Sequence, residues 1–142
     1  MKTITGQLLD NLLKTNDINK YLSEHEADFI AETPASLIEG VLVRKNISVS
    51  EAARLSGVGN YVYKILSGER KASRNVVIAV AVGCGFSYEE TQLLLRVSKF
   101  AILDSRDKRD SVVIFAINNA MSVYSLDDLL YENGLDTINQ NK

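Results

Sequence analysis

The sequence is poor in the residues that cross-link or punctuate a small fold. Among 142 residues there is one Cys (Cys84), one His (His25), one Pro (Pro34) and no Trp. A single Cys cannot form a disulfide within the chain, and one Cys with one His cannot supply the three or four ligands of a zinc site. These absences exclude a disulfide scaffold and a zinc module, and we expect neither a metal nor a cofactor.

Long apolar runs are also lacking. The amino terminus, MKTITGQLLDNLLK, has no apolar core of signal-peptide length, and no stretch approaches the roughly 18 apolar residues that span a bilayer. We therefore expect a cytoplasmic protein with no membrane partner. With 8 Gly and 1 Pro, turn signals are scarce, and Leu, Ala, Ile and Val fill most apolar positions. This composition predicts an all-α protein.

The net charge is only −2, but the charges are unevenly distributed. Residues 1–36 contain three basic and six acidic residues, residues 37–86 seven basic and three acidic, and residues 87–142 six basic and nine acidic. The middle of the chain therefore carries +4 between two segments of −3 each. A basic segment between acidic ones is typical of partner binding.

Apolar residues recur at helical spacing, and capping signals divide them into segments. Asp17, Thr33, Ser73, Ser87 and Ser125 are placed to cap helices. The predicted helices cover about residues 4–14, 18–32, 35–45, 48–57, 60–66, 74–82, 91–97, 105–120 and 125–134. In the first two helices the expected apolar sides consist of Ile4, Leu8, Leu9, Leu12 and Leu13, and of Ile18, Tyr21, Leu22 and Phe29.

Residues 48–71 have the pattern of two short helices around a glycine turn. Ser48 and Glu51 form a capping-box pair at the start of the first helix. Ala53 is small enough for the two helices to approach closely, Gly57 permits the positive φ of the turn, and Val58 fills the angle between the helices. The spacing predicts a helix-turn-helix unit.

At these residues the chain resembles the Xre/Cro/lambda-repressor family. The matching positions are Ile47, Ser48, Ala53, Gly57, Val58, Val62, Ile65, Gly68 to Lys71 and Ser73. Nearly the whole chain is similar to Firmicute helix-turn-helix proteins with an α-helical C-terminal extension, through residues 61–68, 73–74, 87–95, 109–110 and 129–134. The resemblance implies a lambda-repressor-like five-helix helix-turn-helix domain at 34–97, an N-terminal helical arm at 1–33 and a C-terminal helical extension at 98–142.

In a DNA-reading unit of this kind the second helix enters the major groove, and its outward residues meet base edges. Val62, Ile65 and Leu66 point inward, which leaves Asn60, Tyr61 and Lys64 as the candidate base-reading residues. The candidate phosphate contacts are Ser48 at the capped start of the first helix and the basic residues Arg70, Lys71 and Arg74. Each candidate has a plainer alternative: Asn60 as a helix cap, Tyr61 packed on the turn, and the basic residues as solvated charges.

Two functions remain open. The first is a sequence-specific transcriptional regulator that binds double-stranded DNA. The alternative is an adaptor or antitoxin-like module that keeps the fold but binds another protein, and the net charge of −2 favours this reading. No set of catalytic residues is apparent, because His25 lies between two glutamates and Cys84 has no His near it in the motif; we therefore expect no enzyme.

A two-fold DNA site requires a dimer. The run Val112 to Ile117 is apolar around its whole circumference, which is more than one face of a small core needs. We therefore expect residues 98–142, with a contribution from the N-terminal arm as a further option, to mediate homodimerisation. The alternative is that this run is the central helix of a compact monomer.

Overall fold

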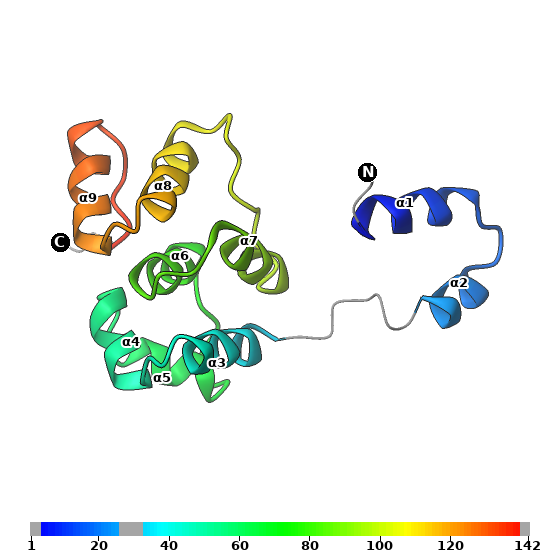
Figure 1. Ribbon diagram of the computed structural model, residues 1–142, viewed down its shortest axis with the longest axis horizontal. Helices are drawn as coiled ribbons and strands as arrows, with labels where there is room; N and C mark the ends of the chain where they lie inside the picture. Colours follow the sequence, from blue (N-terminus) through cyan, green and yellow to red (C-terminus); the bar gives the residue numbers. More distant parts are fainter. Residues whose placement is uncertain (1–3, 26–32, 140–142) are drawn as a thin grey trace. The chain divides into compact units, whose positions relative to one another are not determined.

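The computed structural model describes residues 4–25 and 33–139, and all regular secondary structure in these two ranges is helical (Figure 1). The helices are α1 (Ile4–Lys14), α2 (Ile18–Glu24), α3 (Pro34–Arg44), α4 (Val49–Ser56), α5 (Tyr61–Leu66), α6 (Arg74–Gly83), α7 (Tyr88–Val97), α8 (Lys108–Asn118) and α9 (Val123–Glu132). The prediction of an all-α protein is confirmed. The chain divides into two compact units, residues 1–31 and residues 32–142.

Most of the predicted helix starts are confirmed by side-chain caps. Asp17, Thr33, Ser48, Ser73 and Ser87 each accept a hydrogen bond from the backbone N–H three residues later. This bond satisfies one of the donors left free in the first turn.

Two predicted starts near the carboxyl end are wrong. Helix α8 begins at Lys108 with Asp107 as its cap, not at residue 105. Helix α9 is capped by Ser122 rather than Ser125, which places Val123, Leu126 and Leu130 on one buried face. Both serines can cap a helix, and the earlier start is the one that buries all three apolar residues.

Among the described residues of the first unit, Tyr21 is the buried side chain, and its hydroxyl donates to the Leu8 carbonyl across the two helices, at 3.1 Å. The leucines predicted to form an apolar face are mostly exposed: Leu9, Leu12 and Leu13 on α1 and Leu22 on α2. Phe29 and the side chain of Ile4 lie outside the described residues. The described part of this unit therefore presents apolar surface instead of enclosing it.

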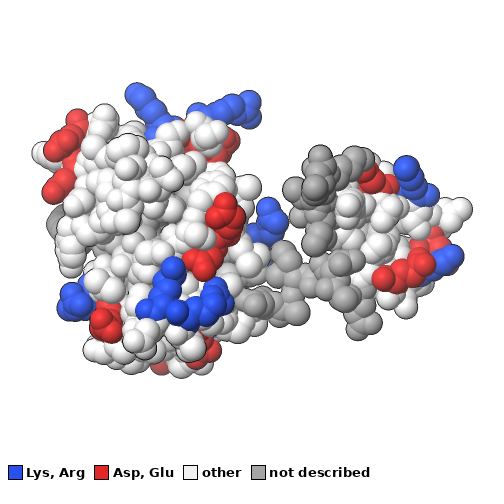
Figure 2. Space-filling model, viewed as in Figure 1, with Lys and Arg blue, Asp and Glu red and all other residues white. Residues whose placement is uncertain are grey.

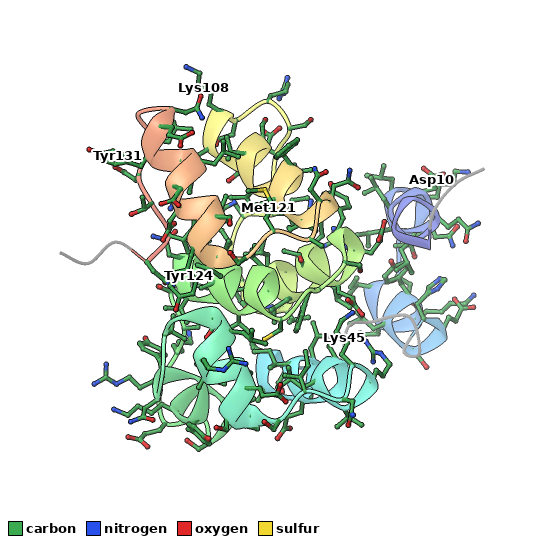
Figure 3. All side chains as sticks on the ribbon, turned by 60° about the vertical axis from the view of Figure 1, so that its left-hand side comes forward. Asp10, Lys45, Lys108, Met121, Tyr124 and Tyr131 are labelled. Atoms are coloured by element: carbon green, nitrogen blue, oxygen red, sulfur yellow. The ribbon has the colours of Figure 1, made fainter. Side chains whose placement is uncertain are left out.

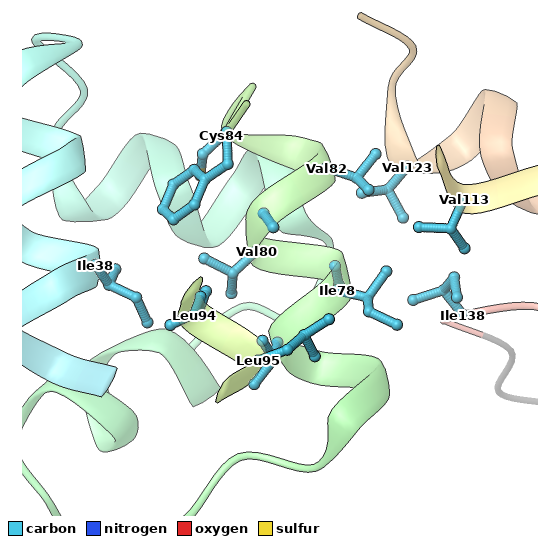
Figure 4. Packing of buried hydrophobic residues seen from close by; sticks show 14 of the residues in the cluster. Ile38, Ile78, Val80, Val82, Cys84, Leu94, Leu95, Val113, Val123 and Ile138 are labelled. Atoms are coloured by element: carbon cyan, nitrogen blue, oxygen red, sulfur yellow. The ribbon is translucent and has the colours of Figure 1, made fainter. Parts of the chain in front are cut away.

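The second unit is organised around α6. Six consecutive residues of this helix, Val77 to Val82, are no more than 5% exposed. Figure 4 shows Val80 packed towards Ile38 and Leu94 on one side, and Ile78 and Val82 packed towards Val113, Val123 and Ile138 on the other. In Figure 1, α6 and α7 accordingly lie between α3, α4 and α5 on one side and α8 and α9 on the other.

The C-terminal helices share this core. Val113, Ala116, Val123, Leu126 and Leu130 are fully buried with the α6 side chains in one hydrophobic cluster. Most side chains of the run Val112 to Ile117 pack against this core, since within the run only Phe115 is exposed. Residues 98–139 therefore belong to the same compact unit as residues 34–97.

An exposed ion-pair group joins α3 to α7. Arg44 contacts Glu90 at 3.1 Å and Lys45 contacts it at 3.8 Å. Burial opposes the charged form of Glu90, but hydrogen bonds from the Ser87 N–H and from Arg44, together with the charge of Lys45, outweigh it, so the pKa of this carboxyl lies below its ordinary value.

No helix in the described ranges combines the length and the apolar character needed to cross a membrane.

Helix α6 approaches the end of α4 at backbone distance. A Cβ added to Gly83 would lie 2.5 Å from the Leu55 carbonyl oxygen and 2.8 Å from the Ser56 Cα. Both atoms belong to the backbone and cannot rotate away. Gly83 therefore fixes how closely α6 and α4 pack.

Gly83→Ala is expected to lower the free energy of unfolding by about 1–3 kcal/mol, because the added methyl forces the two backbones apart. The matched control is Gly40→Ala in the middle of α3, where the nearest atom to a new Cβ is the flexible end of Arg44 at 3.7 Å. That change is expected to raise stability by roughly 0.5–1 kcal/mol through helix propensity. Urea unfolding of both variants, followed by circular dichroism, measures the two values; a stabilised Gly83→Ala variant would contradict the close approach.

Candidate nucleic-acid interface

The turn between α4 and α5 is built on two glycines with left-handed backbone angles. Gly57 has φ 76° and Gly59 has φ 60°, values that L residues with a side chain adopt only under strain. The Gly57 N–H donates to the Arg54 carbonyl and the Gly59 N–H donates to the Ala53 carbonyl, each at 3.2 Å. The turn is therefore closed by hydrogen bonds to the last residues of α4.

Helix α5 is short and has one buried side. Val62 and Ile65 are buried and Leu66 is partly buried against the core. Asn60 is exposed and makes no side-chain capping bond, and Lys64 is partly exposed. Asn60 occupies the N-cap position of α5, but its side chain makes no capping bond, so its amide is available for an external contact.

Tyr61 has a structural task. Its hydroxyl donates to the Lys71 carbonyl at 3.0 Å, and the half-buried ring packs against the core. This bond joins the first turn of α5 to the loop of residues 67–72. Tyr61 therefore positions the loop.

The basic loop after α5 is held close to that helix by its backbone. The Arg70 N–H donates to the Lys64 carbonyl at 3.1 Å, and the Ser67 hydroxyl donates to the same oxygen at 3.2 Å. The side chains of Arg70 and Lys71 are exposed and form no ion pair with the described part of the chain. Lys64, Arg70 and Lys71 thus form a local group of unneutralised cations.

Ser48 is already occupied. Its hydroxyl accepts from the Glu51 N–H at 3.0 Å, and the Glu51 carboxylate accepts from the Ser48 N–H at 3.3 Å. A carboxylate thus sits where a phosphate would have to approach the start of α4, and two anions there would repel each other. The Ser48 hydroxyl is therefore engaged in capping α4, and its phosphate contact stays a prediction.

Arg74 is also engaged elsewhere. Its guanidinium donates to both carboxylate oxygens of Asp110, at 3.2 and 3.1 Å, and to the Ala101 carbonyl at 3.0 Å. Asp110 is only 6% exposed and also accepts from the Asp104 N–H. The predicted phosphate contact of Arg74 is therefore replaced by a bond between α6, α8 and the connector before α8. This link joins residues 36 positions apart, and no local sequence signal indicates it.

The C-terminal segment reaches the α4–α5 turn. The side-chain amide of Asn139 donates to the Ser56 carbonyl at 2.8 Å, and a Cβ on Gly57 would lie 2.6 Å from that amide nitrogen. Asp127 accepts from the N–H groups of Ile138 and Asn139, which fastens the segment to α9. Sequence reasoning missed this contact, which spans 83 residues.

Cys84 and His25 are the other residues whose side chains could be reactive. Cys84 is buried, and burial raises the pKa of its thiol to about 11, so the thiol is protonated at neutral pH. His25 lies in the first unit with its ring 4.7 Å from that of Tyr21. Within the described ranges no three His, Cys, Asp or Glu side chains gather in a way that could hold a metal ion.

One face of the molecule shows how its charges are distributed. On the face seen in Figure 2, Lys and Arg lie in small groups beside Asp and Glu and do not merge into one basic patch. The candidate interface is therefore a local feature of α5 and the loop of residues 67–72.

Compared with protein-family models, with curated proteins and with solved structures, the chain matches none of them. The assignment of a function therefore depends on the geometry described above.

The link between Arg74 and Asp110 predicts a stability effect. Arg74→Ala leaves a buried carboxylate without its cation and is expected to lower the free energy of unfolding by about 2–4 kcal/mol. The double variant, Arg74→Ala with Asp110→Ala, should also have a lower free energy of unfolding. Its loss should be smaller than the sum of the losses in the two single variants by at least ~1 kcal/mol.

Denaturant unfolding of the two single variants and the double variant measures this coupling. The matched control is Arg70→Ala, an exposed residue without an ion pair, which should change stability by less than about 0.5 kcal/mol. Additive losses for Arg74 and Asp110 would show that the two side chains do not stabilise each other.

Proposed function

We propose that α3 to α7 form a lambda-repressor-like helix-turn-helix domain of the Xre type, and that the protein is a sequence-specific transcriptional regulator binding double-stranded DNA. Support comes from the order of the five short helices over residues 34–97 and from the capped α4, the left-handed Gly57 and the short α5 that follows. This combination is what a major-groove reader of the class requires.

One observation carries the proposal: Asn60 and Lys64 are one helical turn apart on α5, and neither side chain is used by the described fold. An Asn side chain can form two hydrogen bonds with adenine, and a Lys can donate to guanine O6 or N7. Tyr61 lies between them in the sequence and holds the loop. We therefore assign base reading to Asn60 and Lys64, with Tyr61 as a positioning residue.

Arg70 and Lys71 are the proposed phosphate contacts. Both are exposed, and their loop is tied to α5 through the Lys64 carbonyl and through the Tyr61 hydroxyl. Phosphate contacts fix the register of a protein on the duplex while base contacts carry the sequence information. Two cations at a fixed offset from α5 meet the first of these needs.

The second candidate function is a protein-interaction module of the adaptor or antitoxin-like kind. Two observations favour it: the net charge of −2, and the mixed charges on the face seen in Figure 2. It predicts that α5 and the loop of residues 67–72 can be changed without any effect on DNA, so the same experiment separates the two functions.

Alanine variants of the proposed contact residues should weaken binding to duplex DNA taken from the region upstream of the protein's own coding sequence. Variants of the phosphate contacts and of the base contact should do so in different ways. Arg70→Ala and Lys71→Ala should weaken all sequences alike and lower the slope of log affinity against log salt by about one for each lost contact. Lys64→Ala should cost about 1–3 kcal/mol at one base position and relax the preference there. Fluorescence anisotropy at several salt concentrations measures both effects.

Lys108→Ala is the matched control, because Lys108 is an exposed cation at the start of α8 that points away from the body of the unit (Figure 3). Its affinity and salt slope should equal those of the unaltered protein. If the Lys64, Arg70 and Lys71 variants bound DNA with the same affinity as the unaltered protein, this interface would be ruled out and the interaction module favoured.

We further propose that the protein acts as a homodimer through α9. Tyr124 and Tyr131 are 65% and 79% exposed, and seven residues apart they lie on one face of the helix. Figure 3 shows Tyr131 pointing outward from the unit. Exposed tyrosines are frequent in interfaces, and these two support an isologous contact better than the Val112 to Ile117 run, in which only Phe115 is exposed.

Light scattering at tens of micromolar is expected to give twice the chain mass of 15.7 kDa. Replacing Tyr124 and Tyr131 by Ser should convert the dimer to a monomer with the same helical circular dichroism, because both side chains are exposed in the single chain. Leu13→Ser on α1 serves as the control for the N-terminal arm. A monomer produced by Leu13→Ser and not by the tyrosine changes would place the interface on α1.

A further inference from the structure

A half-enclosed pocket lies between the start of α3, the end of α5, the loop of residues 67–72 and the end of α7. Its volume is about 740 Å³, and apolar residues such as Pro34, Ala35, Leu66, Val97 and Phe100 line it. Pockets that bind small molecules commonly measure about 300–1,000 Å³ and have largely apolar walls. Size and lining therefore suit a small organic molecule.

The polar residues at this pocket are strongly biased towards positive charge. Arg70, Lys71 and Lys99 line it, and its described lining contains no Asp or Glu. None of the three cations forms an ion pair with a described carboxylate. The pocket therefore complements a ligand with an apolar body and a negative charge.

Ser98 adds a second and independent observation. It lines the same pocket, and its hydroxyl oxygen is buried without a hydrogen-bond partner in the described structure. Buried hydroxyls without a partner are rare in native proteins, because leaving one unsatisfied costs free energy. The oxygen itself has almost no accessible surface, so the hydroxyl has to change its χ1 rotamer to reach an acceptor group inside the pocket.

We propose that this pocket binds a small apolar carboxylic acid. Its carboxylate accepts a hydrogen bond from Ser98 and lies among the charges of Lys99, Lys71 and Arg70, while its hydrocarbon part contacts Leu66, Val97 and Phe100. The site requires no DNA, so it stands apart from the function proposed above.

One consequence does rest on the proposed function. Arg70 and Lys71 are both pocket residues and the proposed phosphate contacts. A bound carboxylate neutralises part of their charge, so the ligand should lower the affinity for DNA. The acid would then act as an effector that releases the protein from its site.

Calorimetric titration of the full chain with decanoate, in the absence of DNA, tests the pocket directly. Two ligands of equal chain length are the controls, uncharged 1-decanol and cationic decylamine. Decanoate is expected to bind at least about tenfold more tightly than either, because only a carboxylate can accept from Ser98 and pair with the cations. Equal affinity for the three ligands, or no heat with decanoate up to about 1 mM, would overturn the proposal.

Three variants locate the binding. Ser98→Ala should weaken decanoate about tenfold while leaving the melting temperature unchanged or higher, since it removes an unsatisfied hydroxyl. Lys99→Gln should weaken it about two- to fivefold, and Lys108→Gln on α8 should have no effect. Unchanged binding in both pocket variants would place decanoate elsewhere and contradict the site.

The DNA measurement is kept separate. With the unaltered protein bound to its DNA, decanoate should raise the apparent Kd for DNA. With the Ser98→Ala variant, about tenfold more decanoate should be needed for the same rise. Decanoate binding without any DNA binding by the protein would refute the proposed regulator and leave the pocket standing. Decanoate binding with an unchanged Kd for DNA would refute only the effector role.

Discussion

The burial of six consecutive residues of α6, Val77 to Val82, is the constraint on which the second unit depends. A helical stretch that is apolar on all sides must be covered on all sides, and α6 packs against α4 and α7 and against the C-terminal helices α8 and α9. Gly83 sets its distance to α4, and Arg74 at its start binds Asp110 of α8. Residues 98–139 therefore complete the core instead of forming a detached extension.

The candidate interface is positioned by the same constraint. Close contact of α6 with α4 fixes where α4 ends, the left-handed Gly57 turns the chain, and buried Val62 and Ile65 orient α5. Asn139 holds the turn from the other side through the Ser56 carbonyl. Helix α5 is so short that it would be unstable in isolation, but these contacts hold it in one orientation. A helix that contacts base edges needs such a fixed orientation.

Local features of this fold could be predicted from the sequence, and long-range features could not. Helix starts at Thr33, Ser48 and Ser87 follow from side chains that cap their own first turn. The start of α9 was misplaced because Ser122 and Ser125 are equally good caps and only burial of Val123 selects between them. The chemistry of Arg74 and Tyr61 suggests DNA contacts, but the partners of both side chains depend on folding: a carboxylate 36 residues away for Arg74 and a backbone carbonyl for Tyr61.

The central claim is that DNA meets the protein at α5 and the loop of residues 67–72. The most direct test is the amide spectrum of ¹⁵N-labelled protein, titrated with duplex DNA from the region upstream of its own coding sequence. The account predicts that the largest shifts fall within residues 59–71. The amides of α9, between Val123 and Glu132, should shift by little or nothing, because the dimer is already formed before DNA is added. Shifts centred on α8 or α9, or an unchanged spectrum over residues 59–71, would contradict it.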